Sequence, residues 1–134
     1  MRVFVTGAAG FIGKATTKEL IANGHEVIGL ARSDANAEAL KKMGAEVHWG
    51  TLQDLDSLQS AAKDADGVIH LAFIHDFSKF VENGQIDARA IEAMGSVLEG
   101  TNKPLIVTSG VGMLAPGEIA TEDMMRRRSG MPRM

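Results

Sequence analysis

The sequence predicts an α/β protein built on a doubly wound parallel sheet of about five strands in the order 3-2-1-4-5. Three observations lead to this fold class. Short apolar segments take turns with amphipathic segments between residues 2 and 110, which is the pattern of consecutive βαβ units. The apolar segments are nearly continuous, as in parallel strands that helices cover on both faces. Crossovers between such strands are right-handed, which makes this strand order the expected one.

The first three elements lie within residues 2–31. Residues 2–6 are rich in Val and Phe and too few for a helix, so they predict a strand. Residues 11–22 predict a helix that ends at the C-terminal signal Asn23-Gly24. Its inward-facing side chains at helical spacing are Ile12, Ala15, Thr16 and Leu20. Residues 26–31, with Val, Ile and Leu, predict the second strand.

The next elements follow the same rules. Residues 34–43 predict a helix that ends at Gly44, with Ser33 or Asp34 as its N-cap, and residues 45–49 predict the third strand. Asp54 is expected to cap a short helix with apolar residues on one face.

Three elements complete the predicted sheet. Residues 67–72 predict the fourth strand and residues 105–108 the fifth. The long helix between them, residues 79–100, is interrupted near its start by Asn83-Gly84. After residue 110 the alternation of apolar and amphipathic segments no longer continues. We therefore predict one domain over residues 1–112, followed by a loop, a short helix or a disordered tail over residues 113–134.

Composition excludes several classes of function. The 134 residues contain no Cys, which excludes disulfides, Cys-ligated zinc and a thiol nucleophile, and no Tyr, which excludes a phenol as catalytic acid. The net charge of −3 argues against nucleic-acid or membrane-surface binding. No apolar run approaches the roughly 20 residues that span a bilayer. A cytoplasmic location is the default expectation.

The strongest motif is Thr6-Gly7-Ala8-Ala9-Gly10-Phe11-Ile12-Gly13, at the junction of the first strand and first helix. Gly7 permits a tight turn, Gly10 lets a pyrophosphate approach the backbone, and Gly13 lets the helix pack closely on the strand. The amide groups and the helix dipole then face an anion. A tight turn without a ligand is the alternative. Its place in the first βα unit favours a Rossmann-like dinucleotide site.

The end of the second strand bears on the choice of cofactor. An acidic residue there favours the 2′-hydroxyl of NAD, whereas Arg favours the 2′-phosphate of NADP. The sequence has Arg32-Ser33-Asp34 at this point. We expect Arg32 and Ser33 to bind the 2′-phosphate, which makes NADP the preferred cofactor. NAD remains an alternative, because Asp34 would approach a ribose if the strand ended later than predicted. Arg32 would then be a solvated loop cation.

These motifs resemble the extended or atypical short-chain dehydrogenases/reductases, the group of NAD(P)-dependent epimerases and dehydratases. Besides the glycine motif, the resemblance rests on Gly29 to Ser33, His70-Leu71-Ala72 and Thr108-Ser109-Gly110. It implies that Gly7, Gly10, Phe11, Ile12 and Gly13 bind the pyrophosphate. It also implies adenine contacts from Thr51 and Leu52, ribose-side contacts from Leu71, Ala72 and Phe73, and a cofactor contact from Thr108.

The resemblance also implies chemistry that this chain holds only in part. Such proteins transfer hydride at a carbonyl or alcohol carbon, using a Ser or Thr after the fifth strand and a Tyr-x-x-x-Lys pair. Ser109 is the candidate hydroxyl, although Gly110 competes for that position, and the Tyr is absent. The adenine motif reads Gly50-Thr51-Leu52, where the family usually has Gly-Asp-Leu. Family members are about twice as long. The chain is thus expected to be an N-terminal portion or a shortened relative that keeps only cofactor binding.

Other candidates are weaker. A non-catalytic NADP-sensing or interaction module is the alternative function, with an unidentified small molecule as substrate in the enzymatic case. His75-Asp76 and His70 do not supply three metal ligands, so no metal site is predicted. His70 is expected to be satisfied by backbone, and Asp87 to be an ordinary helix-surface charge. Exposed sheet edges allow self-association.

Overall fold

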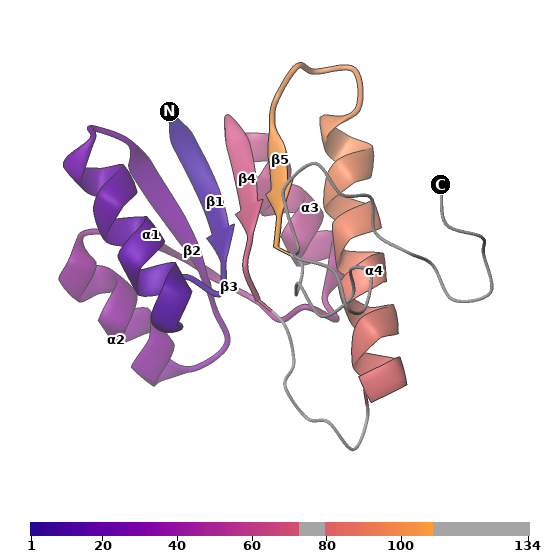
Figure 1. Cartoon of the computed structure of the whole chain (residues 1–134), viewed down its shortest axis with the longest axis horizontal. Coiled ribbons are helices and arrows are strands. Elements are labelled where there is room, and N and C mark those ends of the chain that lie inside the picture. The colour runs from indigo at the N-terminus through magenta and orange to yellow at the C-terminus, as the bar shows by residue number, and fades with distance from the viewer. Residues whose placement is uncertain (73–79, 109–134) are drawn as a thin grey trace, which may run out of the picture.

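The computed structural model describes residues 1–72 and 80–108, and it contains the predicted doubly wound sheet (Figure 1). Five parallel strands are arranged in the order β3-β2-β1-β4-β5, so the fold class is confirmed. The strands are β1 (Arg2–Thr6), β2 (Glu26–Ala31), β3 (Glu46–Trp49), β4 (Gly67–His70) and β5 (Leu105–Val107). The helices are α1 (Phe11–Ala22), α2 (Asp34–Met43), α3 (Leu55–Asp64) and α4 (Phe80–Leu98).

Helices cover both faces of the sheet. Figure 1 shows α1 and α2 on one side and α3 and α4 on the other. Because successive strand residues point to opposite faces, β1 contributes to two separate cores. Phe4 packs in a cluster with Leu58 of α3 and Met94 of α4, and Val5 packs in a second cluster with Leu40 of α2. β1 is therefore buried on both faces, as its continuous apolar sequence predicts.

The fourth strand is shorter than predicted. β4 ends at His70, whereas the apolar run suggested an end at Ala72. The reason is a tertiary contact with Thr6. The Leu71 N–H is shared between the Thr6 carbonyl, at 3.2 Å, and the Thr6 side-chain oxygen, at 3.1 Å, and the Ala72 N–H donates to that side-chain oxygen, also at 3.1 Å. Because the Ala72 amide donates to a side chain rather than to a neighbouring strand, the regular ladder does not continue past this point.

The buried face of α1 also differs from the predicted one. Gly13 and Thr17 are its buried residues, while Ala15 is exposed and Ile12 is 58% exposed. The neighbouring Phe11 is 94% exposed. Helical periodicity counts apolar side chains, whereas close packing of α1 on the sheet selects the residue without a side chain at this point. Phe11 and Ile12 are consequently exposed at the amino end of α1.

The amino edge of the sheet is charged and exposed. The Arg2 side chain donates to Glu26 at 3.0 Å and to Glu46 at 3.1 Å, bridging β1, β2 and β3. The hydrogen bond to Glu26, aided by Glu46, raises the pKa of the Arg2 guanidinium above its ordinary value. The Arg2 backbone N–H donates to the Asp66 carboxylate at 2.8 Å.

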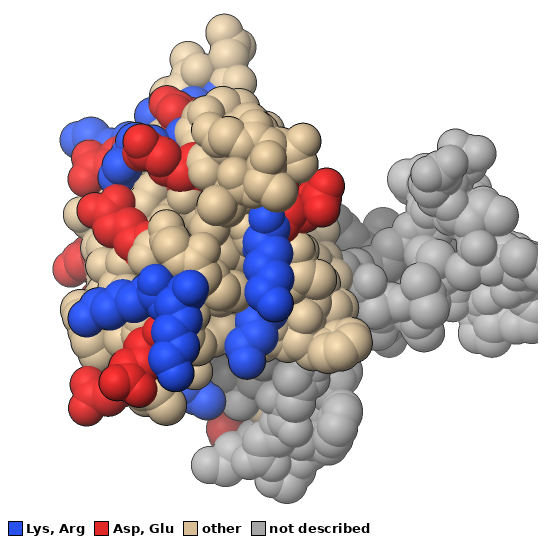
Figure 2. Space-filling model, turned by 90° about the vertical axis from the view of Figure 1, so that its left-hand side faces the viewer, with Lys and Arg blue, Asp and Glu red and all other residues tan. Residues whose placement is uncertain are grey.

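Charges of both signs lie on the face that α1 and α2 cover. Figure 2 shows basic side chains interspersed with acidic ones over this side of the described residues, rather than a single basic patch. Within residues 1–72 and 80–108, no helix has the length and hydropathy needed to cross a bilayer.

Candidate functional site

The main cleft of the described residues opens at the carboxyl edge of the sheet, with a volume of about 990 Å³. This volume lies at the upper end of the usual range for small-molecule sites. The cleft is where doubly wound folds bind ligands, beyond the carboxyl ends of the strands near the change in strand order. Its lining residues are Gly7, Ala9, Gly10, Phe11, Ile12, Gly13, Leu30, Arg32, Asn36, Gly50, Thr51, Leu52, Gln53, Leu71 and Ala72.

The glycine motif forms a tight turn between β1 and α1. Gly7 has φ of +71°, a left-handed conformation that side-chain-bearing residues rarely adopt, and a Cβ there would lie 2.8 Å from the Ala72 nitrogen. The Gly10 N–H donates to the Gly7 carbonyl at 3.0 Å and closes the turn. A Cβ on Gly13 would overlap that same carbonyl. Gly7 and Gly13 are thus required by the fold of the turn itself.

The amino end of α1 differs from those of the next two helices. Ser33 caps α2 and Asp54 caps α3 with a side-chain oxygen, and each helix has an acidic residue in its first turn. The N-cap of α1 is Gly10, with no side-chain hydrogen bond and no acidic residue in the first turn. Its first N–H groups have no intrahelical acceptor. Because these donors and the positive end of the helix dipole face the cleft, this helix end suits an anion.

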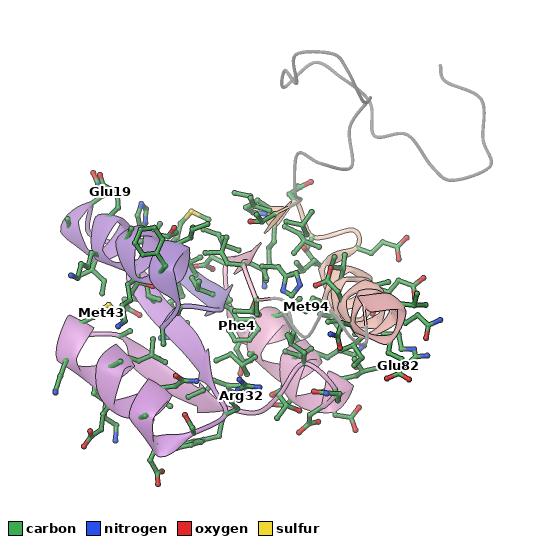
Figure 3. The ribbon with its side chains drawn as sticks, turned by 60° about the horizontal axis from the view of Figure 1, so that its bottom comes forward. Phe4, Glu19, Arg32, Met43, Glu82 and Met94 are labelled. Atoms are coloured by element: carbon green, nitrogen blue, oxygen red, sulfur yellow. The ribbon has the colours of Figure 1, made fainter. Side chains whose placement is uncertain are left out.

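Arg32 lies immediately after β2 and lines the cleft. Figure 3 looks onto the carboxyl edge and shows Arg32 between the α1–α2 layer and the α3–α4 layer. Ser33 is outside the cleft lining, and its oxygen accepts the Asn36 N–H at 3.2 Å as the cap of α2. Of the two expected caps, the structure therefore selects Ser33, and Asp34 is the first residue of the helix. Asn36, which the sequence analysis missed, lines the cleft with Arg32.

The far wall of the cleft comes from the segments after β3 and β4. Thr51 is exposed on this wall, and Leu52 is largely buried and also belongs to the core beneath it. Leu71 and Ala72 complete the wall. Gln53 is a further wall residue that no motif indicated.

Of the remaining predicted residues, the structure describes Thr108, which is not among the residues that line this cleft. Thr108 is exposed at the end of β5, where its N–H donates to the His70 carbonyl at 3.2 Å. Phe73 and Ser109 lie outside the described residues, as do His75 and Asp76. Across residues 1–72 and 80–108, no group of three or more potential ligands is placed to hold a metal ion.

A chain of polar side chains lies behind the cleft. The Thr6 oxygen is 2.7 Å from Nδ1 of His70, and Nε2 of His70 is 2.6 Å from Oδ1 of Asp87 on α4. His70 is 2% exposed and the Asp87 side chain 22%. Two expectations are wrong here. The His70 ring is satisfied by side chains rather than by backbone, and Asp87 is a hydrogen-bonding partner of a buried residue rather than an ordinary surface charge.

Residues 3–122 match the NAD dependent epimerase/dehydratase family. The chain belongs to this family. The match spans the sheet, the glycine turn and the cleft, so the described residues form the NAD-binding domain of this family. The resemblance read from the glycine motif is thereby confirmed.

Several relatives are longer than this chain. An uncharacterized protein of Schizosaccharomyces pombe is 52% identical over 91% of this chain, which spans 42% of that relative. The sterol-4-alpha-carboxylate 3-dehydrogenase (decarboxylating) of Dictyostelium discoideum is 44% identical over 52% of this chain and 21% of its own length. The UDP-glucose 4-epimerase of Bifidobacterium longum, crystallised with NAD+ and UDP, superposes with a TM-score of 0.72. That comparison covers 99% of this chain and 44% of the epimerase at 24% identity, which shows a shared fold.

Proposed function

We propose that this domain binds NADP in preference to NAD, and that it serves a protein that transfers hydride at a carbonyl or alcohol carbon. The observation that carries the proposal is the uncapped amino end of α1 at the mouth of the cleft. Family membership supports a nicotinamide cofactor, and the dehydrogenase relative supports the reaction class. Bound there, the cofactor would supply or accept the hydride.

The residues present fit the cofactor's diphosphate. Backbone N–H groups at Phe11, Ile12 and Gly13 are the orphan donors of the first helical turn, and the dipole adds positive potential. A Cβ at Gly10 would meet only the Gly7 carbonyl, at 3.3 Å, so this position otherwise leaves open space beside the donors. These amides would bind and orient the diphosphate without any charged side chain.

The charge of the cleft supports NADP over NAD. Arg32 is the only charged residue among the described cleft-lining residues, and none of these is acidic. Recognition of the NAD ribose usually uses a carboxylate at this position, whereas a guanidinium forms paired, charge-assisted bonds to a phosphate. Arg32 would bind the 2′-phosphate, with the Asn36 amide beside it. Ser33 would contribute its hydroxyl hydrogen, because its oxygen accepts the Asn36 N–H.

The other contacts are assigned along the two walls. Thr51 and Leu52 would contact the adenine, and Leu71 and Ala72 the ribose on the nicotinamide side. Phe73 and Thr108 would extend that side. Ser109 would be the hydroxyl that contacts the substrate carbonyl.

A second candidate is a module that binds NADP without turnover. This candidate concerns the 134 residues by themselves, which hold the cofactor cleft but no Tyr, the residue that usually serves as proton donor in such proteins. In this case occupancy of the cleft would alter a surface read by a partner. The two candidates share the cofactor site and differ only in whether hydride leaves it.

Calorimetric titration tests the shared part of the proposal. We expect saturable one-site binding of NADP and weaker binding of NAD. Absence of saturable heat with either nucleotide would contradict the proposal. Oxidation of NADPH, followed at 340 nm in the presence of a panel of aldehydes and ketones, then separates the candidates, because turnover excludes the non-catalytic module.

A further inference from the structure

The buried chain of Thr6, His70 and Asp87 connects three elements behind the cleft. Thr6 ends β1, His70 ends β4 beside it in register, and Asp87 lies on α4. Thr6 is fully buried, and His70 nearly so. Polar groups at such depth are costly unless hydrogen-bonded, so a chain of three needs a structural or functional reason.

Counting donors and acceptors assigns the protons in this chain. The Thr6 hydroxyl oxygen accepts the N–H of Ala72, and shares the N–H of Leu71 with the Thr6 carbonyl. Its two lone pairs are thus used, and its hydrogen is donated to Nδ1 of His70. Nδ1 is then an acceptor, and Nε2 carries the hydrogen that it donates to the Asp87 carboxylate. His70 is therefore the neutral Nε2–H tautomer.

The same hydroxyl holds both walls of the cleft. Thr6 precedes Gly7, which begins the diphosphate turn, and the two N–H groups it accepts belong to Leu71 and Ala72 on the opposite wall. The approach between the walls is close, because a Cβ on Gly7 would lie 2.8 Å from the Ala72 nitrogen. A small change in the position of Thr6 would therefore move one wall against the other.

We propose that Thr6, His70 and Asp87 form a proton-ordered positioning relay, which sets the spacing of the cleft walls and ties it to α4. The expected effect of these residues on NADP affinity rests on the proposed function. These residues act through the backbone of the walls and are not catalytic. The Thr6 and His70 side chains are buried, and their described hydrogen-bonding positions are occupied within the relay. Asp87 would fix the tautomer of His70, and His70 would fix the orientation of the Thr6 hydroxyl. Thr6 would in turn hold the N–H groups of Leu71 and Ala72.

Paired variants of the whole chain test the relay. Thr6→Val removes the hydroxyl with little change in shape, and Thr6→Ser restores it. Asp87→Ala removes the acceptor for Nε2–H, and Asp87→Asn restores an oxygen acceptor at the same place. Asp66→Ala is the matched control, because it removes a hydrogen bond between β1 and β4 at the opposite edge of the sheet.

NADP affinity, measured by calorimetry at temperatures where every variant is folded, is the first readout. We expect Thr6→Val and Asp87→Ala to raise the Kd about tenfold, because buried groups lose their partners. Thr6→Ser and Asp87→Asn should remain within about threefold of the wild type. Asp66→Ala should lower the free energy of unfolding and leave NADP affinity unchanged. Wild-type affinity in Thr6→Val and Asp87→Ala, or an equal loss in Asp66→Ala, would overturn the proposal. If Thr6→Val does not fold, Asp87→Ala decides.

A second readout needs no cofactor. The ¹⁵N spectrum of the imidazole in the wild-type chain should show the Nε2–H tautomer for His70, with slow amide exchange at Leu71 and Ala72. An Nδ1–H tautomer or rapid exchange would overturn the relay. If the wild type binds neither nucleotide, the proposed function fails, and these spectra alone then decide whether the relay exists.

Discussion

The two edges of the sheet join the same strands by different means. At the amino edge, β1 and β4 are linked by the exposed Arg2 backbone and Asp66, beside ion pairs of the Arg2 side chain. At the carboxyl edge, they are linked through the buried Thr6 and His70, next to an uncapped helix. Exposed ion pairs contribute little to stability and tolerate change, whereas buried hydrogen bonds fix geometry. We infer that the buried hydrogen bonds at the carboxyl edge, rather than the exposed contacts at the amino edge, fix the relative positions of β1 and β4.

The helix ends repeat this contrast. α2 and α3 begin with side-chain caps and acidic residues, which satisfy their first N–H groups. α1 begins at Gly10 without either. A Gly at the N-cap costs a helix roughly a few tenths of a kcal/mol relative to Ser or Asp. The helix among these three that has no side-chain cap is α1, whose amino end lines the cleft with the glycine turn, as expected of a helix that binds an anion in place of a cap.

The largest effect is expected for Gly13→Ala. Its Cβ would overlap the Gly7 carbonyl, so we expect about 3 kcal/mol of destabilisation and loss of measurable NADP binding. Urea denaturation and calorimetry measure the two effects. Gly84→Ala is the matched control. Gly84 is exposed in α4 with nothing near its would-be Cβ, so this change should stabilise by up to about 1 kcal/mol. Equal destabilisation by Gly13→Ala and Gly84→Ala would contradict the inference that close packing at the cleft edge requires Gly13.

Arg32→Ala should have the next largest effect, confined to one cofactor. Charged hydrogen bonds are worth about 1.5–3 kcal/mol, so NADP affinity should fall by roughly tenfold to a hundredfold. NAD affinity should stay at its wild-type value, because NAD lacks the 2′-phosphate. Parallel titrations with both nucleotides measure the difference. An equal loss for both would contradict the assigned role of Arg32.

Gly10→Ser tests whether a side-chain cap at the amino end of α1 competes with the diphosphate for the same N–H groups. The added hydroxyl can cap α1, a gain of roughly a few tenths of a kcal/mol, but its Cβ would lie 3.3 Å from the Gly7 carbonyl. We therefore expect little net change in the free energy of unfolding. NADP affinity should fall about tenfold, because the side chain takes up amides and space that the diphosphate needs. Unchanged affinity would show that the diphosphate does not use this helix end.

The smallest effect is expected for Arg2→Ala, at the opposite edge from Arg32. The guanidinium and its partners Glu26 and Glu46 are exposed, so removing the ion pairs should change thermal stability only slightly. Affinity for both nucleotides should be unchanged. Any selective loss of NADP affinity would indicate that charge acts on the cofactor over the whole molecule rather than at the cleft.

Sequence alone predicted the strand order and almost every element, because buried parallel strands and amphipathic helices are local patterns. The boundaries moved where a tertiary contact overrides the pattern. β4 ends early because the amides of Leu71 and Ala72 are used by Thr6, which is 65 and 66 residues away in the chain. Periodicity grouped Ile12 with the inward face of its helix, whereas the glycine motif assigned it to the diphosphate site. The structure packs Gly13 against the sheet and leaves Ile12 at the cleft.

The site was predictable to the extent that its residues belong to motifs. The glycine turn, Arg32, Thr51, Leu52, Leu71 and Ala72 line one cleft as expected. Asn36 and Gln53 carry no motif, and only the fold brings them to the wall. The partnership of His70 with Asp87 depends on how α4 packs against β4, which spacing along the chain does not specify. Asp34 and Ser33 are both good caps, and the structure selects Ser33.

The proposed cofactor site depends on the bare amides of α1 binding the cofactor's diphosphate. Titration of the ¹⁵N-labelled chain with NADP, followed by amide ¹H–¹⁵N spectra, tests this contact residue by residue. We expect the largest shifts at the N–H groups of Phe11, Ile12 and Gly13, saturating with the calorimetric Kd. Saturation that leaves these three signals unmoved while others shift would contradict the account.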